Sequence, residues 1–247
     1  MSESSPSGGG AGPAPATLLA PIFPLPNATL FPAAVMPLHV FEPRYKAMVR
    51  AALEGHGMIA IAQLKPGWEG QYFGRPPIYR TMGIGVIADC EEHADGRFDL
   101  MLEGRHRARL ASEELHGAGF RVGRFDVMDG RAAEPGNPAG PAVQADAPES
   151  TEAAPATAEG PETAEARAAL LSVLRPLLDL LPPPARAALG AGAWSDDTPA
   201  GNLADIVAHV FLDHDPYARQ GILEEPDVPR RLRLVRVQLR AMLDMGE

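Results

Sequence analysis

The sequence has a single cysteine, only two lysines (Lys46 and Lys65) and no long apolar run. One cysteine, Cys90, excludes an internal disulfide and a thiolate metal centre, which is typical of a protein from a reducing compartment. No stretch approaches the roughly 18 uninterrupted apolar residues that a membrane helix needs. Residues 1–17 also lack the positive start and the apolar core of a signal peptide. We therefore expect a cytoplasmic protein with no membrane partner.

The motifs of several common enzyme classes are missing as well. There is no G-x-x-x-x-G-K-[ST] phosphate loop and no G-x-S-x-G nucleophile elbow, and the G-I-G at residues 83–85 lacks the third glycine of a dinucleotide site. His209 and His214 are five residues apart and do not share a helix face, so they predict no metal site. We interpret His39 and His106 as hydrogen-bonded strand or core histidines. The sequence thus predicts no catalytic residue, no metal and no cofactor.

Composition and charge divide the 247 residues into four segments. A Gly/Ser/Pro-rich start (1–17) is expected to be disordered. A β-rich unit (18–130) follows, then an acidic Pro/Ala-rich linker (131–164), and finally a helical unit (165–247). Most of the net charge of −10 comes from the linker region, where residues 131–166 hold seven acidic residues and one basic residue. The acidity therefore says little about the folded surface.

The β-rich unit predicts short strands interrupted by one helix. The helix over 43–55 has Tyr45, Met48, Val49 and Leu53 on one face and stops at Gly55. A long hairpin flanks the turn at Asp95–Gly96. Several strands with one intervening helix predict a small, closed antiparallel barrel.

The second arm of this hairpin alternates between two faces. The inner face is assigned to Phe98, Leu100, Leu102, Gly104, His106, Ala108 and Leu110, and the outer face to Arg97, Asp99, Met101, Glu103, Arg105, Arg107 and Arg109. Four arginines on the outer face, which we call the arginine row, are candidates for contacts with a nucleic-acid backbone: Arg97, Arg105, Arg107 and Arg109. The alternative is a solvated face in which the acidic residues pair across strands. The acidic net charge and the absence of interleaved aromatic residues favour the solvated face.

The helical unit predicts a helix over 165–181 that kinks or breaks at Pro176. A second helix is expected over 202–213, a short third over 216–225, and a last helix that begins at the N-cap residue Asp227. The arginines of the last helix are interpreted as a solvated face: Arg230, Arg231, Arg233, Arg236 and Arg240.

Two motifs near the start of the chain carry a resemblance. They are Phe23, Pro24, Leu25 and Pro26, and then Phe41, Glu42, Pro43, Arg44 and Tyr45. This combination resembles the N-terminal, substrate-binding (LON) domain of Lon proteases. The similarity extends through the hairpin and into the helical tail, over about residues 20–130 and 165–245. The resemblance implies an α+β fold, with a PUA-like antiparallel barrel of about six strands and one helix, followed by a C-terminal helical bundle.

The resemblance also implies a structural role for the motif residues. Glu42 and Arg44 are expected to bind backbone or partner charges at the corner before the helix, while Phe41 and Tyr45 are expected to pack inward. The ATPase and Ser-Lys protease modules that follow this domain in Lon proteases have no counterpart in the 247 residues. The chain therefore resembles the stand-alone LON-domain proteins of bacteria, and the expectation is a protein that is not an enzyme.

Three functions remain open. The first is a binding module for polypeptide segments, or an adaptor for a protease. The second is RNA binding through the arginine row, and the third is a small-molecule pocket or an unrecognised hydrolase. The resemblance favours the first. It assigns no client and no oligomeric state.

Overall fold

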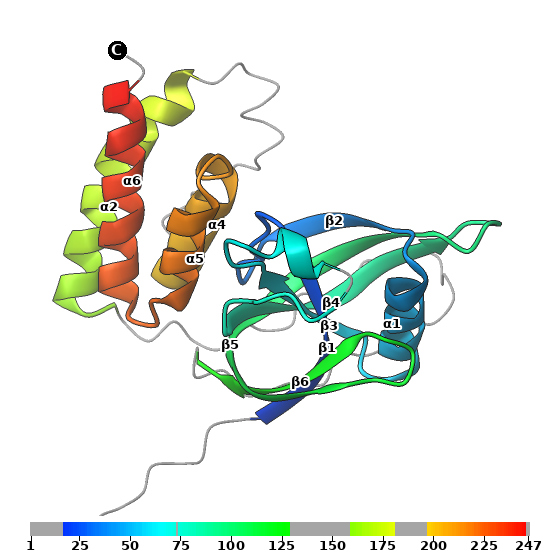
Figure 1. The fold of residues 1–247 in the computed structure, drawn as a ribbon. Helices are drawn as coiled ribbons and strands as arrows, with labels where there is room; N and C mark the ends of the chain where they lie inside the picture. The colour runs from blue at the N-terminus through cyan, green and yellow to red at the C-terminus, as the bar shows by residue number, and fades with distance from the viewer. Residues whose placement is uncertain (1–16, 73, 129–158, 181–196, 246–247) are drawn as a thin grey trace, which may run out of the picture.

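The structure is a computed structural model that describes residues 17–72, 74–128, 159–180 and 197–245 (Figure 1). Nearly all of the N-terminal segment that we expect to be disordered, and nearly all of the acidic linker, lie outside these ranges. The described chain forms a β-barrel and a group of α-helices beside it. The predicted α+β class is confirmed.

Six strands form one sheet in the described part of the chain, in the order β2-β5-β4-β3-β1-β6. Their bounds are β1 Thr17–Leu25, β2 Val35–Val40, β3 Met58–Gln63, β4 Thr81–Glu92, β5 Phe98–Leu115 and β6 Arg121–Val127. Because β5 also pairs with β6, five strands close into a ring, and β2 is attached outside it. The 18-residue β5 makes this possible: its first part pairs with β2 and its last part with β6.

One pair in this sheet differs from the predicted antiparallel pattern. β1 and β3 run parallel, with Ile22 opposite Ala60. The reason is the connection between them: β2 leaves the ring to pair with β5, and the helix α1 (Pro43–Glu54) returns the chain to the side where β1 began. Parallel neighbours need such a crossover.

The predicted faces of the hairpin are confirmed on the inside of the barrel, where Phe98, Leu100 and Leu102 are buried. The glycines at 83 and 104 permit a close approach. A Cβ atom at Gly83 would lie 1.8 Å from the carbonyl oxygen of Leu30, and one at Gly104 would lie 2.0 Å from that of Phe31. The chain between β1 and β2 therefore passes directly over these two strands, as the packing interpretation of the G-I-G sequence predicts.

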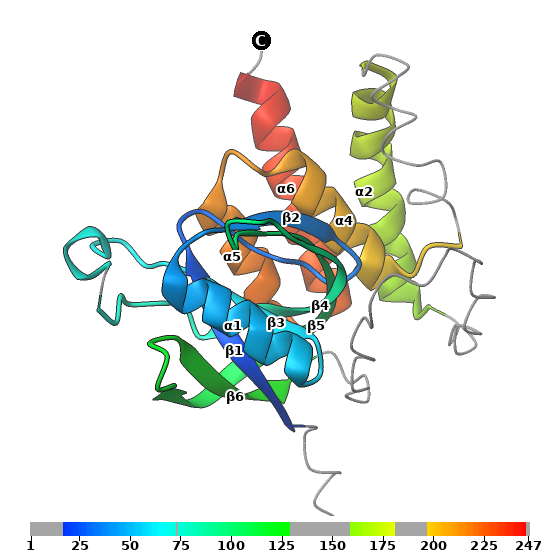
Figure 2. The same cartoon turned by 90° about the vertical axis from the view of Figure 1, so that its right-hand side faces the viewer.

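The helix α1 covers the end of the barrel opposite the other helices, which Figure 2 shows by placing α1 in front of the strands. Pro43 opens its first turn, and Tyr45, Met48, Val49 and Ala52 form its buried face. It ends at Glu54, next to the predicted stop at Gly55.

The remaining described helices are α2 Pro161–Leu180, α4 Ala200–Phe211, α5 Pro216–Glu224 and α6 Val228–Met245. α2 begins four residues before the predicted start at Glu165, and it runs through Pro176 to Leu180, so the break expected there does not occur. Pro176 removes only the hydrogen bond to the carbonyl of Ser172, and both residues are exposed, so water can replace the missing donor.

The helical core is built from both parts of the chain. Leu170, Leu203 and Leu239 pack with Phe31 and Ala34, two residues of the connection between β1 and β2. Leu30, the neighbour of Phe31, belongs instead to the core under α1. Consecutive residues of one connection therefore enter two different cores, which fixes the helices against the barrel.

Buried charges cross the same boundary. Arg107 of β5 is 1% exposed, and its Nη2 donates to Asp205 Oδ1 of α4 at 2.8 Å, while its Nε donates to the carbonyl of Leu223 at 2.6 Å. Arg231 of α6, 4% exposed, places Nε 3.2 Å from the same carboxylate oxygen. The interpretation of both arginine rows as wholly solvated is therefore wrong at Arg107 and Arg231. Spacing alone puts them on charged faces, but the fold covers each face at that point.

Replacing the shared acid tests this arrangement. Asp205→Asn keeps the size of the side chain but leaves two buried guanidinium groups without their counter-charge, so the free energy of unfolding should fall by about 3–5 kcal/mol. Urea unfolding followed by circular dichroism measures the loss. Glu103→Gln is the matched control, because it removes the partner of the exposed Arg105 and should cost less than about 1 kcal/mol. Equal losses in the two variants would contradict the central role of Asp205.

Candidate functional site

The outer face of β2, β5 and β4 carries a shallow pocket of about 390 Å³. The strand register aligns two rows across this face: His39, Asp99 and Glu91 in one, and Pro37, Met101 and Asp89 in the next. All six of these residues contribute to the lining. Since alternate residues of each strand point outward, the pocket combines the apolar side chains of Pro37 and Met101 with three carboxylates and one histidine.

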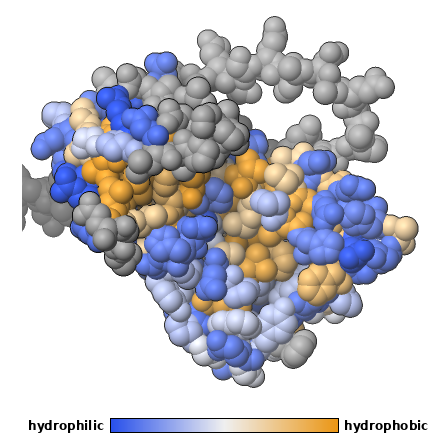
Figure 3. All heavy atoms as spheres, turned by 90° about the horizontal axis from the view of Figure 1, so that it is seen from above, coloured by the Kyte–Doolittle hydropathy of each residue, from blue (hydrophilic) through white to orange (hydrophobic). Residues whose placement is uncertain are grey.

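Apolar side chains continue beyond the pocket along β2. Val35 is 45% exposed, Met101 37% and Phe41, just after the strand, 61%. Figure 3 views the molecule from above and shows apolar side chains gathered in two areas, one on the helical part and one on the barrel, with hydrophilic residues around them. We call the area formed by Val35, Pro37, Phe41 and Met101 the β2 surface.

Two histidines bind the same carboxylate at the edge of this surface. His39 Nδ1 is hydrogen-bonded to Asp99 Oδ1, and His93 Nε2 lies 2.7 Å from Asp99 Oδ2. The hydrogen bond to Asp99 raises the pKa of His93 above its ordinary value, and Glu91 adds to the effect while Arg97 opposes it. The two histidines in turn lower the pKa of Asp99. His39 is therefore a hydrogen-bonded strand histidine, as predicted.

The histidine pair gives a pH prediction. Because the pKa of His93 is raised in the folded protein, its contact with Asp99 stabilises the fold below the ordinary pKa of about 6.5 and is lost as the pH rises through the folded value. An NMR titration should therefore place the midpoint of His93 above the ordinary histidine value of about 6.5. Asp99→Asn should lower the His93 midpoint toward that value; an unaltered midpoint would show that Asp99 does not control it.

The motif that carries the resemblance lies at the corner before α1. Arg44 Nε donates to Glu42 Oε2 at 3.1 Å, and its Nη2 donates to the carbonyl of Tyr72 at 3.2 Å. The Tyr72 hydroxyl donates to the other oxygen of Glu42, which raises the pKa of that tyrosine. Tyr45 is 5% exposed, and its ring packs against that of Phe23 in a tilted arrangement with centroids 4.6 Å apart.

Phe41 is the motif residue that does not pack at this corner. It was expected to pack inward, but the structure exposes it. Val40 takes the inward position at the end of β2, so the next residue of the extended chain points to the other side. Phe41 thereby joins the β2 surface.

Removing the Glu42 carboxylate from the corner before α1 should lower the stability of the protein. Glu42→Ala leaves the half-buried guanidinium of Arg44 and the hydroxyl of Tyr72 without their acceptor, so the free energy of unfolding should fall by about 1–2 kcal/mol. Thermal and urea unfolding measure this change. Phe41→Ala, one residue away and exposed, should stay within about 0.5 kcal/mol of the parent protein. If Glu42→Ala is as stable as the parent protein, the structural role assigned to the motif is wrong.

The arginine row does not form a continuous free surface. Arg97 pairs with Asp95 at 2.6 Å and Arg105 with Glu103 at 3.0 Å. Arg107 is buried against the helices, and the exposed Arg109 lies opposite Asp126 of β6 in the strand register. The structure therefore separates the four candidates rather than bringing them together.

The other candidate positions show no metal chemistry. Within the described ranges, no group of three or more His, Cys, Asp or Glu side chains is arranged to hold a metal ion. His209 lies in α4 beside Arg219, and burial lowers its pKa, while His214 lies beyond the helix end. Burial also raises the pKa of the Cys90 thiol. In the same ranges, no helix has the length and hydropathy to cross a membrane.

Comparison with known proteins identifies the family. A family model described as the ATP-dependent protease La (LON) substrate-binding domain matches residues 20–241. The chain belongs to this family. The match confirms the resemblance carried by the two motifs.

Curated relatives of this LON domain are much longer proteins. A Lon protease of Desulfosudis oleivorans is 25% identical over 225 residues, which are 91% of this chain and 24% of that protein. A Lon protease 2 of Syntrophobacter fumaroxidans is 27% identical over 89 residues, 36% of this chain and 11% of that protein. The chain thus spans about a quarter or less of these relatives.

Solved structures share the fold of the LON domain. A Lon N-terminal domain protein from Xanthomonas campestris has a TM-score of 0.51 and 23% identity, covering 91% of this chain and 98% of its own. The N-terminal domain of a Mycobacterium avium complex Lon protease has a TM-score of 0.57 and 18% identity, covering 90% of this chain and 98% of its own. At these identities the similarity establishes the fold.

Proposed function

We propose that this LON domain binds extended polypeptide segments on the β2 surface, without a catalytic step of its own. The observation that carries the proposal is the position of β2, the outermost strand of the described sheet, beside exposed apolar side chains and a pocket. The family supports protein substrates in general; the site on β2 is our assignment. As for location, we propose the cytoplasm, on the same sequence grounds as above.

The edge of β2 offers backbone groups to an incoming segment. β2 pairs with β5 along one side, from Val35 to Val40. On the other side of β2 the backbone of Val35 is hydrogen-bonded to His209 of α4. Beyond Val35, β2 is the last strand of the described sheet, so its outer N–H and C=O groups can pair with an extended peptide. Pro37 removes one of these donors, which fits an edge strand and blunts indiscriminate pairing. Backbone hydrogen bonds of this kind supply affinity for many different sequences.

The side chains around β2 add selectivity. Val35, Phe41 and Met101 offer apolar contacts to the alternate residues of a bound segment. Asp89, Glu91 and Asp99 border them with negative charge, and the bases in ion-pair contact with these acids within the described residues are His39 and His93. Charge complementarity therefore favours segments in which apolar residues alternate with Lys or Arg, and disfavours segments in which they alternate with Asp or Glu.

Binding to labelled peptides tests the proposal. Two short fluorescent peptides with the same apolar residues, one carrying Lys and the other Glu, are compared by fluorescence anisotropy. The Lys peptide should bind more tightly. Met101→Ser and Phe41→Ser should each weaken it about tenfold, because either change removes an apolar contact worth about 1.5 kcal/mol or more.

Val237→Ser is the matched control, because Val237 is 55% exposed on α6 and lies outside the β2 surface. Its affinity for the Lys peptide should equal that of the parent. Unchanged affinity in both Met101→Ser and Phe41→Ser would reject the β2 surface as the site. The same assay with single-stranded RNA covers the alternative function: salt-sensitive RNA binding that is lost in Arg109→Gln would replace the polypeptide proposal.

A further inference from the structure

A second pocket lies on the barrel wall, where β4 separates from β5. The two strands pair only as far as Thr81 and Arg109, after which Leu110 N donates to the carbonyl of Arg80 at 2.8 Å. The chain before β4 then turns away toward β3, where Leu64 bridges to Ile78. The separation leaves a pocket of about 370 Å³, within the size range of small-molecule sites.

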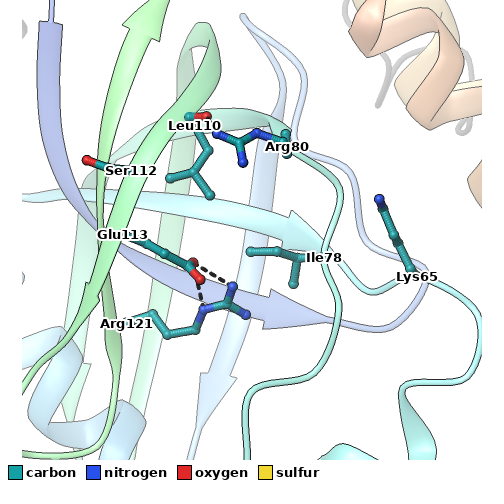
Figure 4. Close-up of a pocket in the computed structure, with 7 residues that line it drawn as sticks. All are labelled: Lys65, Ile78, Arg80, Leu110, Ser112, Glu113 and Arg121. Carbon is teal, nitrogen blue, oxygen red and sulfur yellow. Dashed lines mark hydrogen bonds and ion pairs between the residues drawn. The ribbon is translucent and has the colours of Figure 1, made fainter.

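The lining of this pocket is cationic, although the chain as a whole has a net charge of −10. Lys65, Arg80 and Arg121 line it together with one acid, Glu113 (Figure 4). Glu113 is already neutralised twice: Arg121 binds one of its oxygens through Nε at 2.9 Å and Nη2 at 2.5 Å, and Arg75 binds the other at 2.8 Å. Its negative charge is therefore more than balanced before any ligand enters, and Lys65 and Arg80 are the two lining cations that do not pair with it.

These two cations keep donors for a ligand. Arg80 Nη2 donates to the carbonyls of Leu110 and Ala111 in β5. This fixes the guanidinium at the pocket, and the structure assigns no acceptor within the described residues to its Nε and Nη1. Over the same residues, the Lys65 ammonium contacts the Tyr79 ring at 5.3 Å and forms no ion pair. Ser112 adds an exposed hydroxyl to the lining.

We propose that this pocket binds a phosphate group, either inorganic phosphate or the phosphate of a small monoester. A phosphate carries close to two negative charges at neutral pH and presents several acceptor oxygens, which matches the charges and free donors of Lys65 and Arg80. Ile78 and Leu110 supply an apolar wall for the organic part of a monoester. A carboxylate matches less well, because it brings one charge. The site is separate from the β2 surface and is independent of the function proposed there.

The scarcity of lysine provides a direct test. Reductive methylation of the whole protein with ¹³C-formaldehyde labels the side chains of Lys46 and Lys65 and keeps their charges. Inorganic phosphate, phenyl phosphate and benzoate are titrated at constant ionic strength. The Lys65 signal should shift and saturate with both phosphates, at lower concentration with phenyl phosphate, and shift little with benzoate. Lys46, on α1, is the internal control and should not respond.

Two variants complete the experiment. In Arg80→Gln, the Lys65 response to phosphate should require about tenfold more ligand, the loss expected for one charge-assisted hydrogen bond. Lys65→Gln removes no side-chain hydrogen bond or ion pair within the described residues, only the contact with the Tyr79 ring. If Arg80→Gln is unstable, calorimetric titration of Lys65→Gln with phosphate gives the same comparison. An equal response of Lys46 and Lys65, no saturation, or full affinity in Lys65→Gln would overturn the proposal. Benzoate binding as tightly as phenyl phosphate would reject phosphate as the ligand group.

Discussion

The arrangement of barrel and helices depends on one carboxylate. Asp205 receives a buried arginine from β5 and another from α6, so three charges with a net value of +1 lie where water is excluded. Removing charges from water is expensive, and the cost is offset only while partners stay in place. Moving the helices away from the barrel would leave an unmatched charge on one side. The interaction therefore specifies a geometry more than it adds stability, and it complements the apolar contacts of Phe31 and Ala34.

That fixed geometry determines where ligands can reach. The helices cover the long β4–β5 hairpin at Arg107. The outer face of the hairpin stays open in two places: near the hairpin turn, where β2 lies, and near the start of β4. The first opening is apolar with acidic neighbours, and the second is cationic. The two surfaces thus differ in charge and lie on different segments, which suits partners of different chemistry.

Local patterns in the sequence predicted the parts of the fold that depend on neighbours along the chain. Alternation and the Asp95–Gly96 turn gave the hairpin and its inner face, and Tyr45, Met48 and Val49 gave the buried side of α1. Arg107 and Arg231 were misassigned because their burial depends on Asp205, a residue 98 positions away from Arg107. An aspartate amid Leu203, Ala204 and Val207 was the available signal, since an acid on an apolar helix face needs a buried partner.

The candidate site shows the same division. The outward positions of Asp99 and Met101 followed from alternation, but their meeting with Pro37 and Asp89 depends on strand pairing and on a register shift between Ile87 and Asp89. Phe41 was misjudged because the alternation of β2 continues one residue past Val40 and turns Phe41 outward. The phosphate pocket had no sequence signal, since its lysine, arginines and serine come from four separate segments.

The attachment of β2 outside the closed ring has a dynamic consequence. The ring of β5, β4, β3, β1 and β6 keeps all of its own pairings when β2 is absent. β2 can therefore separate through a local opening at a fraction of the free energy of global unfolding, whereas any ring strand must break two ladders. Its amide protons should exchange with solvent before those of the ring. A strand that opens independently can also exchange places with a competing segment while the barrel remains folded.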